Sequence, residues 1–239
     1  MKKLIIILIL FPLFGSSAKK SMDISIELPQ TGYGGFEISL IQEMFAEGWC
    51  DFYKDSKTGE YYLKQANFYI ETSYDECAED TIVSVSSERA YSLLIIKGLK
   101  SKKKPVKTLV LPIREGVQVG EKHSFRFGRK IYALRAEGTV ENGKTPDKGE
   151  YYDWNEIKNY KLYLSDGKRE QLITTVSEFE GTSPQILWVG DLDGDGKPDF
   201  AVRTAKWYED EKIELFLSSI ADKGELVKLA DTAYFFRPC

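Results

Sequence analysis

The segment 186–204, ILWVGDLDGDGKPDFAVRT, constrains the fold more than any other stretch of this chain. Two apolar runs, ILWV and FAV, flank a loop in which aspartate recurs at every second position from 191 to 195. The runs consist of β-forming residues and lack the spacing of amphipathic helices, so each is predicted to be a strand. The sequence therefore predicts two strands joined by an acidic, glycine-bearing loop.

The rest of the chain is a succession of short strand-like segments. Apolar and polar residues alternate in many of them, which is typical of half-buried strands. Turn residues separate them, and Asp166 followed by Gly167 is a strong two-residue hairpin signal. The strands are predicted at residues 23–28, 36–40, 49–53, 61–70, 81–86, 91–97, 108–113, 123–127, 130–140, 160–164, 169–175, 212–218 and 226–236, with 31–35 as a turn.

These patterns predict an all-β or β-dominated α+β fold of many short antiparallel strands. Helical spacing occurs at residues 41–48, where Ile41, Met44 and Phe45 would share one face. No sequence repeat is evident, so the chain is not expected to be a full propeller. Residues 19–239 are predicted to form a single β-rich domain, or two subdomains divided near the polar stretch 141–150.

The acidic loop has the ligand pattern of a calcium site. Counted from Asp191, carboxylates occupy positions 1, 3, 5 and 9, which are Asp191, Asp193, Asp195 and Asp199. Glycine occupies position 6, Gly196, where a calcium loop turns sharply. Because calcium takes six to eight oxygen ligands, these residue types at this spacing predict a calcium site.

The loop departs from the helix-flanked calcium site at its end. That site has a bidentate glutamate at position 12, whereas position 12 here is Val202. Asp199 is therefore predicted to close the coordination shell, and Lys197 to contribute its backbone carbonyl with its side chain pointing away. Magnesium fits less well because it gives up its water ligands reluctantly. The alternative is a metal-free acidic turn, but four neighbouring aspartates repel each other unless a cation is present.

The stretch GDLDGDGKPDFAV resembles the calcium loop of FG-GAP or VCBS-type repeats, the β-hairpin loops found in integrin alpha-chain propellers. The resemblance covers residues 190–202 and their immediate flanks, and it implies a hairpin stiffened by calcium. Propellers carry several such loops, whereas this chain has one. The longer stretch 188–239 is similar to secreted bacterial proteins with a single such loop and no assigned reaction. That similarity implies export and calcium binding.

The N-terminus has the pattern of a secretory signal peptide. A positive MKK precedes an apolar run, LIIILILFPLF, and then small residues. Ser16 and Ala18 fit the −3 and −1 positions, so residues 1–18 are predicted to be removed after Ala18. The alternative, a transmembrane helix, needs about 20 apolar residues. We therefore expect an extracytoplasmic protein, periplasmic or secreted, with no later membrane span.

The charge and the cysteine content limit the partners. The formal net charge is −4, and loss of Lys2 and Lys3 makes it more negative, so nucleic acid is not an expected partner. The basic stretch 99–107 is interpreted as a solvated turn. Export permits a disulfide among Cys50, Cys77 and Cys239. Cys50–Cys77 is slightly preferred because it closes the shortest loop, and Cys77–Cys239 is the alternative.

No recognisable catalytic motif accompanies the calcium loop. His123 is the one histidine, and neither a G-x-S-x-G nor an HExxH motif occurs. A carboxylate pair for glycoside hydrolysis has no fixed spacing and stays open. The cluster Tyr151, Tyr152, Asp153 and Trp154 is interpreted as packing rather than a sugar-stacking surface.

The sequence thus favours an exported, calcium-binding β-rich protein with a binding or structural role, in which calcium is structural. The alternative is a secreted hydrolase of glycan or peptide that uses calcium as a scaffold. Besides calcium, a glycan or a protein is the partner to consider. The ligand set expected for Ca²⁺ is Asp191, Asp193, Asp195, Lys197 and Asp199.

Overall fold

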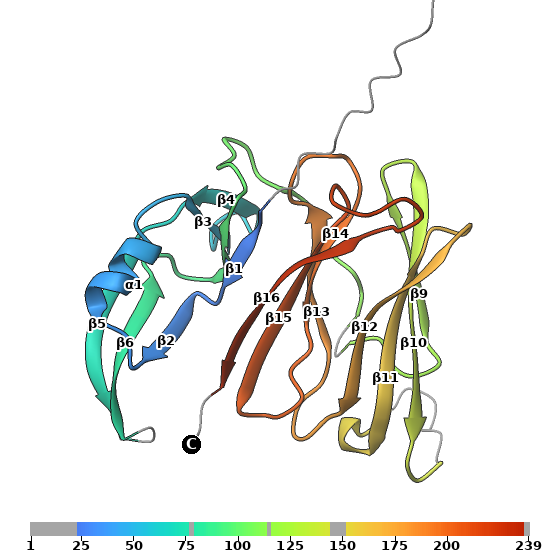
Figure 1. The fold of residues 1–239 in the computed structure, drawn as a ribbon. Helices are drawn as coiled ribbons and strands as arrows, with labels where there is room; N and C mark the ends of the chain where they lie inside the picture. The colour runs from blue at the N-terminus through green and yellow to red at the C-terminus, as the bar shows by residue number, and fades with distance from the viewer. Residues whose placement is uncertain (1–22, 77–78, 114–115, 144–151, 237–239) are drawn as a thin grey trace, which may run out of the picture.

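A computed structural model describes residues 23–76, 79–113, 116–143 and 152–236 (Figure 1). The described residues form four antiparallel sheets and one α-helix, and none of the sheets closes into a barrel or a propeller. The β-dominated fold class predicted from the sequence is therefore confirmed.

The first half of the chain forms two small sheets. The N-terminal sheet has the order β1-β7-β3-β4, and the small sheet has the order β2-β6-β5. The helix α1 (Ile38–Met44) follows β2. The strands are β1 (Ser25–Glu27), β2 (Gln30–Gly34), β3 (Trp49–Lys54), β4 (Tyr61–Gln65), β5 (Phe68–Asp75), β6 (Asp80–Ser87) and β7 (Ser92–Lys97).

The second half forms two larger sheets. The central sheet has the order β16-β15-β14-β13-β8, and the outer sheet has the order β12-β11-β10-β9. A short 3-10 turn, η1 (Trp154–Glu156), precedes β11. The strands are β8 (Lys107–Leu109), β9 (Lys122–Phe127), β10 (Lys130–Val140), β11 (Ile157–Ser165), β12 (Glu170–Glu178), β13 (Gln185–Asp191), β14 (Asp199–Arg203), β15 (Asp210–Leu217) and β16 (Lys228–Phe236).

The central sheet is buried on both faces. Phe200 and its cross-strand partner Phe216 pack into a core shared with the outer sheet. The next pair along, Ala201 and Leu215, packs with Trp188 into a second core shared with the N-terminal sheet. Successive residues of a strand point to opposite faces. Two-faced burial therefore explains why the runs beside the acidic loop are apolar at consecutive positions.

A third core lies on the other side of the N-terminal sheet. Ile41 and Phe45 of the α1 segment pack there against Val83 and Val85 of β6 and against Ile95 of β7. The layers therefore run from α1 and the small sheet, through the N-terminal and central sheets, to the outer sheet (Figure 1). The acidic loop joins β13 to β14 at one end of the central layer.

Several boundaries predicted from the alternating pattern are wrong. Residues 36–40 were predicted to be a strand, but α1 begins at Ile38 because Ile38, Ile41 and Phe45 bury one helical face. The predicted turn 31–35 belongs largely to β2, which pairs with β6. The predicted strand 61–70 is two strands, β4 and β5, which break at residues 66–67 and enter different sheets. The predicted strand 108–113 is shorter, since β8 ends at Leu109.

Cys50 is a free, buried cysteine. Its thiol donates to the carbonyl oxygen of Leu99 over 3.6 Å, and burial raises its pKa. The preferred Cys50–Cys77 disulfide is therefore wrong in this structure. Cys77 and Cys239 lie outside the described residues, so their pairing stays a prediction.

The sequence also predicts a signal peptide, no later membrane span and a possible subdomain boundary. The signal peptide, residues 1–18, lies outside the described residues. Among the described residues, no helix has the length and apolar character needed to cross a membrane. Of the predicted boundary 141–150, residues 144–150 lie outside the described residues. The strands before and after it, β10 and β11, are hydrogen-bonded neighbours in the outer sheet.

Candidate metal site

The acidic loop is held between the ends of two paired strands. Asp191 is the last residue of β13 and Asp199 is the first residue of β14, and Gly190 pairs directly with Asp199. Gly190 has to be small, because a Cβ there would overlap the Trp188 ring and the carbonyl oxygen of Lys107 in β8. The strand pairing therefore fixes both ends of the loop.

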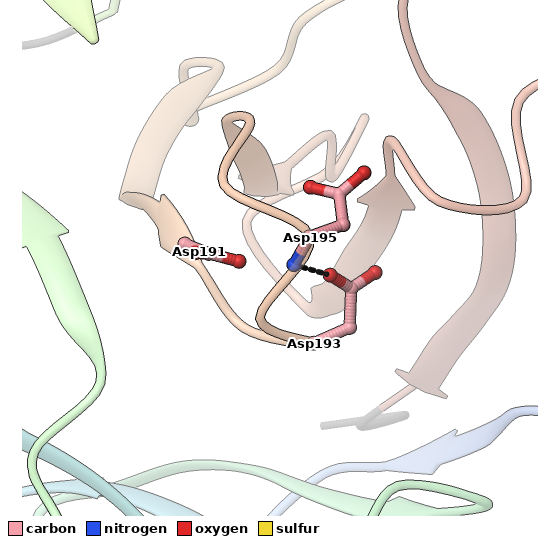
Figure 2. A group of neighbouring side chains, drawn as sticks. All are labelled: Asp191, Asp193 and Asp195. Atoms are coloured by element: carbon pink, nitrogen blue, oxygen red, sulfur yellow. Dashed lines mark hydrogen bonds between the residues drawn. The ribbon is translucent and has the colours of Figure 1, made fainter. Parts of the chain in front are cut away.

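Three carboxylates converge inside the loop. One oxygen from each of Asp191, Asp193 and Asp195 lies within 4.8 Å of the others, and Figure 2 shows the three side chains gathered along the curve of the loop. These are three of the five predicted ligands. Oxygens this close together can share one hard cation, and like charges this close repel each other when no cation is present.

Backbone N–H groups of the loop orient these carboxylates. Asp191 accepts from Gly194 at 2.7 Å and from Gly196 at 3.1 Å. Asp193 accepts from the N–H of Asp195 at 3.1 Å, the bond drawn in Figure 2. Gly194 and Gly196 have φ values of 92° and 83°, a left-handed conformation that side chains disfavour. The glycine spacing of the sequence is thus what lets the chain wrap around its own carboxylates.

The second oxygen of Asp193 stands out in this arrangement. Its Oδ2 is buried and has no hydrogen-bond partner among the described residues. Leaving a buried acceptor unpaired costs about 1–3 kcal/mol, and more when the acceptor is charged. This oxygen therefore marks the position in the loop where a cation would be most favourable.

Asp199 lies behind the converging group rather than within it. Its side chain is fully buried and accepts from the N–H of Leu192 and the N–H of Ser218, each at 2.8 Å. Burial raises the pKa of Asp199 to about 8, and the negative charge of Asp193 adds to that effect. Asp199 therefore has a role that its spacing in the sequence does not indicate: its hydrogen bond with Ser218 connects the loop to the end of β15.

Ser218 is a further residue at the site that the sequence did not single out. Its hydroxyl lies 3.0 Å from Asp195 Oδ1 and 3.1 Å from Asp199 Oδ1. It follows directly after β15, so no local spacing in the sequence could have placed it at the loop. The sequence pattern assigns Ser218 only to the predicted strand 212–218.

The Lys197 side chain differs from its predicted orientation. Its ammonium pairs with Asp195 Oδ2 at 3.0 Å instead of pointing away from the loop. Lys197 N–H also donates to Asp195 Oδ1 at 2.8 Å. This cation is half exposed and neutralises only one of the three converging carboxylates, so the cluster keeps an excess of negative charge.

The other residues singled out in the sequence have structural surroundings. His123 lies on β9, an edge strand of the outer sheet. Its Nε2 lies 3.0 Å from Oε2 of Glu121. Trp154 is buried and makes edge-on ring contacts with Tyr160 and Phe179, consistent with packing. Tyr152 packs partly against the same core, and Tyr151 lies outside the described residues.

Two clefts elsewhere bear on the hydrolase alternative. A cleft of about 610 Å³ between β4, β8 and β13 has Glu60 as the one carboxylate in its described lining, and that group accepts from the Tyr62 hydroxyl. In a second cleft of about 510 Å³, Asp210 accepts from Tyr234 and Glu211 pairs with Arg203. Its acidic residues are consecutive in the chain, so neither lining presents carboxylates from two facing elements, as glycoside hydrolysis requires. The hydrolase alternative stays a prediction.

Comparisons with protein-family models, with curated proteins and with solved structures find no match to this chain.

Proposed function

We propose that this chain is an exported β-rich protein with a binding or structural role, in which one calcium ion stiffens the β13–β14 hairpin. The loop would then act as a single copy of the FG-GAP or VCBS-type loop that its sequence resembles. The buried, unpartnered Oδ2 of Asp193 beside Asp191 and Asp195 carries the proposal. A divalent cation satisfies that oxygen and removes the repulsion among the three carboxylates.

Calcium suits this loop for chemical reasons. The donors are carboxylate oxygens, which hard cations prefer, and no histidine or cysteine lies in residues 190–199. Three converging carboxylates are fewer than the six to eight ligands that calcium takes. Water, the predicted carbonyl of Lys197 and the predicted carboxylate of Asp199 complete the set in this proposal.

The structural role follows from where the loop lies. It joins the two strands at the middle of the central sheet, which both large cores share. An ion bound only by the folded loop stabilises the folded state by RT ln(1 + [Ca²⁺]/Kd). Extracellular calcium modules have Kd values of about 10⁻⁴ to 10⁻³ M. Calcium at 1 mM outside the cell would then raise the unfolding free energy by about 0.4–1.4 kcal/mol.

Thermal unfolding with and without calcium tests this proposal. The purified protein is stripped with EDTA, and its Tm is measured in EDTA and in 10 mM CaCl₂ at constant ionic strength. We expect calcium to raise the Tm by roughly 3–10 °C. The Asp193→Ala variant should lose that increase. Equal melting curves for the stripped wild-type protein in both buffers would refute the proposal.

A matched control separates the loop from calcium effects elsewhere. Asp55 also receives backbone N–H groups in a hairpin loop, from Lys57 at 3.0 Å and Thr58 at 2.8 Å, but it is outside the converging cluster. Asp55→Asn should therefore keep the full calcium-dependent increase in Tm. Magnesium at the same concentration should give a smaller increase, because it holds its water ligands more tightly.

A further inference from the structure

A cleft beside the acidic loop has more cationic than acidic side chains in its described lining. This loop cleft has a volume of about 470 Å³ and includes both Lys197 and Ser218 of the candidate metal site in its walls. Its cationic side chains are Lys130, Arg169, Lys197 and Lys223, and its acidic ones are Asp222 and Glu225. Asp222 is already paired with Lys228 at 2.8 Å. The net charge of the remaining side chains in the lining of the loop cleft is therefore positive.

A second basic cleft adjoins the first. This turn cleft, of about 520 Å³, lies between the β9–β10 and β11–β12 hairpins and shares Lys130 and Tyr132 with the loop cleft. Its cations are Lys122, Arg129, Lys130 and Lys168. Asp166 is the one acidic residue in its described lining, and it pairs with Arg169 at 2.9 Å.

Most of these cations are available to a ligand. Lys122, Arg129, Lys130, Lys168 and Lys223 are all exposed, and none of them forms an ion pair with a described residue. The whole chain carries a net charge of −4, so this concentration of unpaired cations is local. Unpaired cations around two adjoining clefts suit a ligand with several separated anionic groups, because each group can meet its own ammonium or guanidinium.

Hydroxyl groups line the same surface. Tyr132 lies at the junction of the two clefts, and its hydroxyl makes no hydrogen bond with a described residue. Ser124 and Ser165 add two more hydroxyls in the turn cleft. Tyr132 is the one aromatic residue in the described lining, and its ring is buried. Single-stranded nucleic acids are held largely by stacking of their bases on exposed aromatic rings. A surface with cations and hydroxyls but no exposed ring in its described lining therefore suits an acidic sugar chain better than a single-stranded nucleic acid.

We propose that the two clefts form a binding site for a linear polysaccharide that carries sulfate or carboxylate groups, and that calcium in the acidic loop strengthens this binding. The second part rests on the proposed calcium function. Lys197 provides the coupling, because its ammonium lines the loop cleft while it pairs with Asp195 at 3.0 Å. A calcium ion that takes over Asp195 frees this ammonium for an anionic group of the ligand.

Binding of dextran sulfate, with neutral dextran as the uncharged control, tests the site. Isothermal titration calorimetry on the full chain in EDTA should detect dextran sulfate and not dextran. The double variant Lys130→Gln/Lys168→Gln should weaken binding roughly tenfold, as expected for two lost charge contacts. The matched variant Lys57→Gln/Lys161→Gln also removes two exposed lysines, but from outside both clefts, and should change the affinity less than twofold.

Three outcomes would overturn the site. The first is no binding of dextran sulfate in either EDTA or calcium. The second is equal weakening by the two double variants, which would mean general attraction to a polyanion. The third is equally tight binding of a single-stranded DNA oligonucleotide of the same charge, which would mean that the surface does not select sugars.

The coupling is tested by repeating the titrations in calcium. Wild-type affinity for dextran sulfate should rise by roughly threefold to tenfold, whereas Lys197→Met should show no rise at a calcium concentration that saturates its loop. An unchanged wild-type affinity together with a normal Tm increase would overturn the coupling alone. An absent Tm increase would overturn the calcium function and the coupling, and titration in EDTA would still decide the polysaccharide site.

Discussion

The acidic loop and the β11–β12 turn both begin with an aspartate that accepts backbone hydrogen bonds, but they contain different numbers of carboxylates. In both, an aspartate begins the turn and its Oδ1 accepts the N–H three residues later, from Gly194 to Asp191 and from Arg169 to Asp166. The β11–β12 turn has one carboxylate, and Arg169 neutralises it at 2.9 Å. The acidic loop brings two more carboxylates to the same place. One aspartate suffices to build a turn, and the proposed cation would account for the additional carboxylates.

The largest effect should come from removing Asp199. Alanine at this position leaves the buried N–H groups of Leu192 and Ser218 without their acceptor. Each unpaired buried group costs about 1–3 kcal/mol, so Asp199→Ala should lower the unfolding free energy by about 3 kcal/mol or more. Urea unfolding measures this loss, and it should persist in EDTA. A loss confined to calcium buffer would show that Asp199 acts only through the ion.

The effect of Asp193→Asn on stability should depend on calcium. In EDTA the variant should be as stable as the wild-type protein or more stable, because it removes the charge from a buried oxygen without a partner. In 10 mM calcium it should be less stable by about 1–3 kcal/mol, since the ion is bound weakly or not at all. Parallel urea titrations give both numbers. Destabilisation of equal size in both buffers would assign Asp193 a purely structural role.

The β11–β12 turn should instead respond to acid. Partial burial raises the pKa of Asp166, but hydrogen bonds and the charge of Arg169 outweigh it and lower the pKa to about 2. A carboxyl whose folded pKa is lowered stabilises the fold above its unfolded pKa, near 3.9, and this stabilisation is lost as the pH falls toward 2.

Asp166→Asn should therefore cost about 1 kcal/mol at pH 6 and progressively less below pH 4. Urea midpoints of the wild-type and variant proteins between pH 6 and pH 2.5 measure this convergence, and calcium should not change it. A constant difference over the whole range would mean that the turn gains nothing from the ionised carboxylate.

The smallest effect should come from Lys197→Met. This change removes the single ammonium that neutralises Asp195, so the loop becomes more negative and should bind calcium slightly more tightly. The pair is half exposed, so the gain should be about 0.5 kcal/mol, roughly a twofold lower Kd, and high salt should reduce it. Calcium titration calorimetry at two ionic strengths measures this gain. Weaker calcium binding by the variant would mean that the lysine side chain supports the site.

The sequence predicted those features that depend on neighbouring residues. Alternation and turn residues identified the β-dominated fold and the Asp166 turn, and aspartate spacing identified the cluster of Asp191, Asp193 and Asp195. Consecutive apolar residues beside the loop identified strands, although their burial on two faces became evident only when both neighbouring sheets were in place.

Features that depend on contacts between distant residues were not predictable. Ser218 reaches the loop because β15 pairs with β14, which local spacing cannot show. Residues 36–40 alternate like a strand, yet they enter α1 because a core formed by β6 and β7 takes up one helical face. Cys50 lies nearest to Cys77 in the sequence, but its own strand buries it as a free thiol. In each case the decisive energy comes from packing between remote segments.

The two-faced burial of the central sheet has a consequence for how the chain loses its structure. Melting of either large core would remove support from β13, β14 and β15, and the opposite faces of the same strands form part of the other core. Four sheets would otherwise allow stepwise melting. Here the shared layer couples the two halves, so we expect a single cooperative calorimetric transition. Because the strands of the central sheet belong to both cores, a substitution that weakens packing in one core should also destabilise the other.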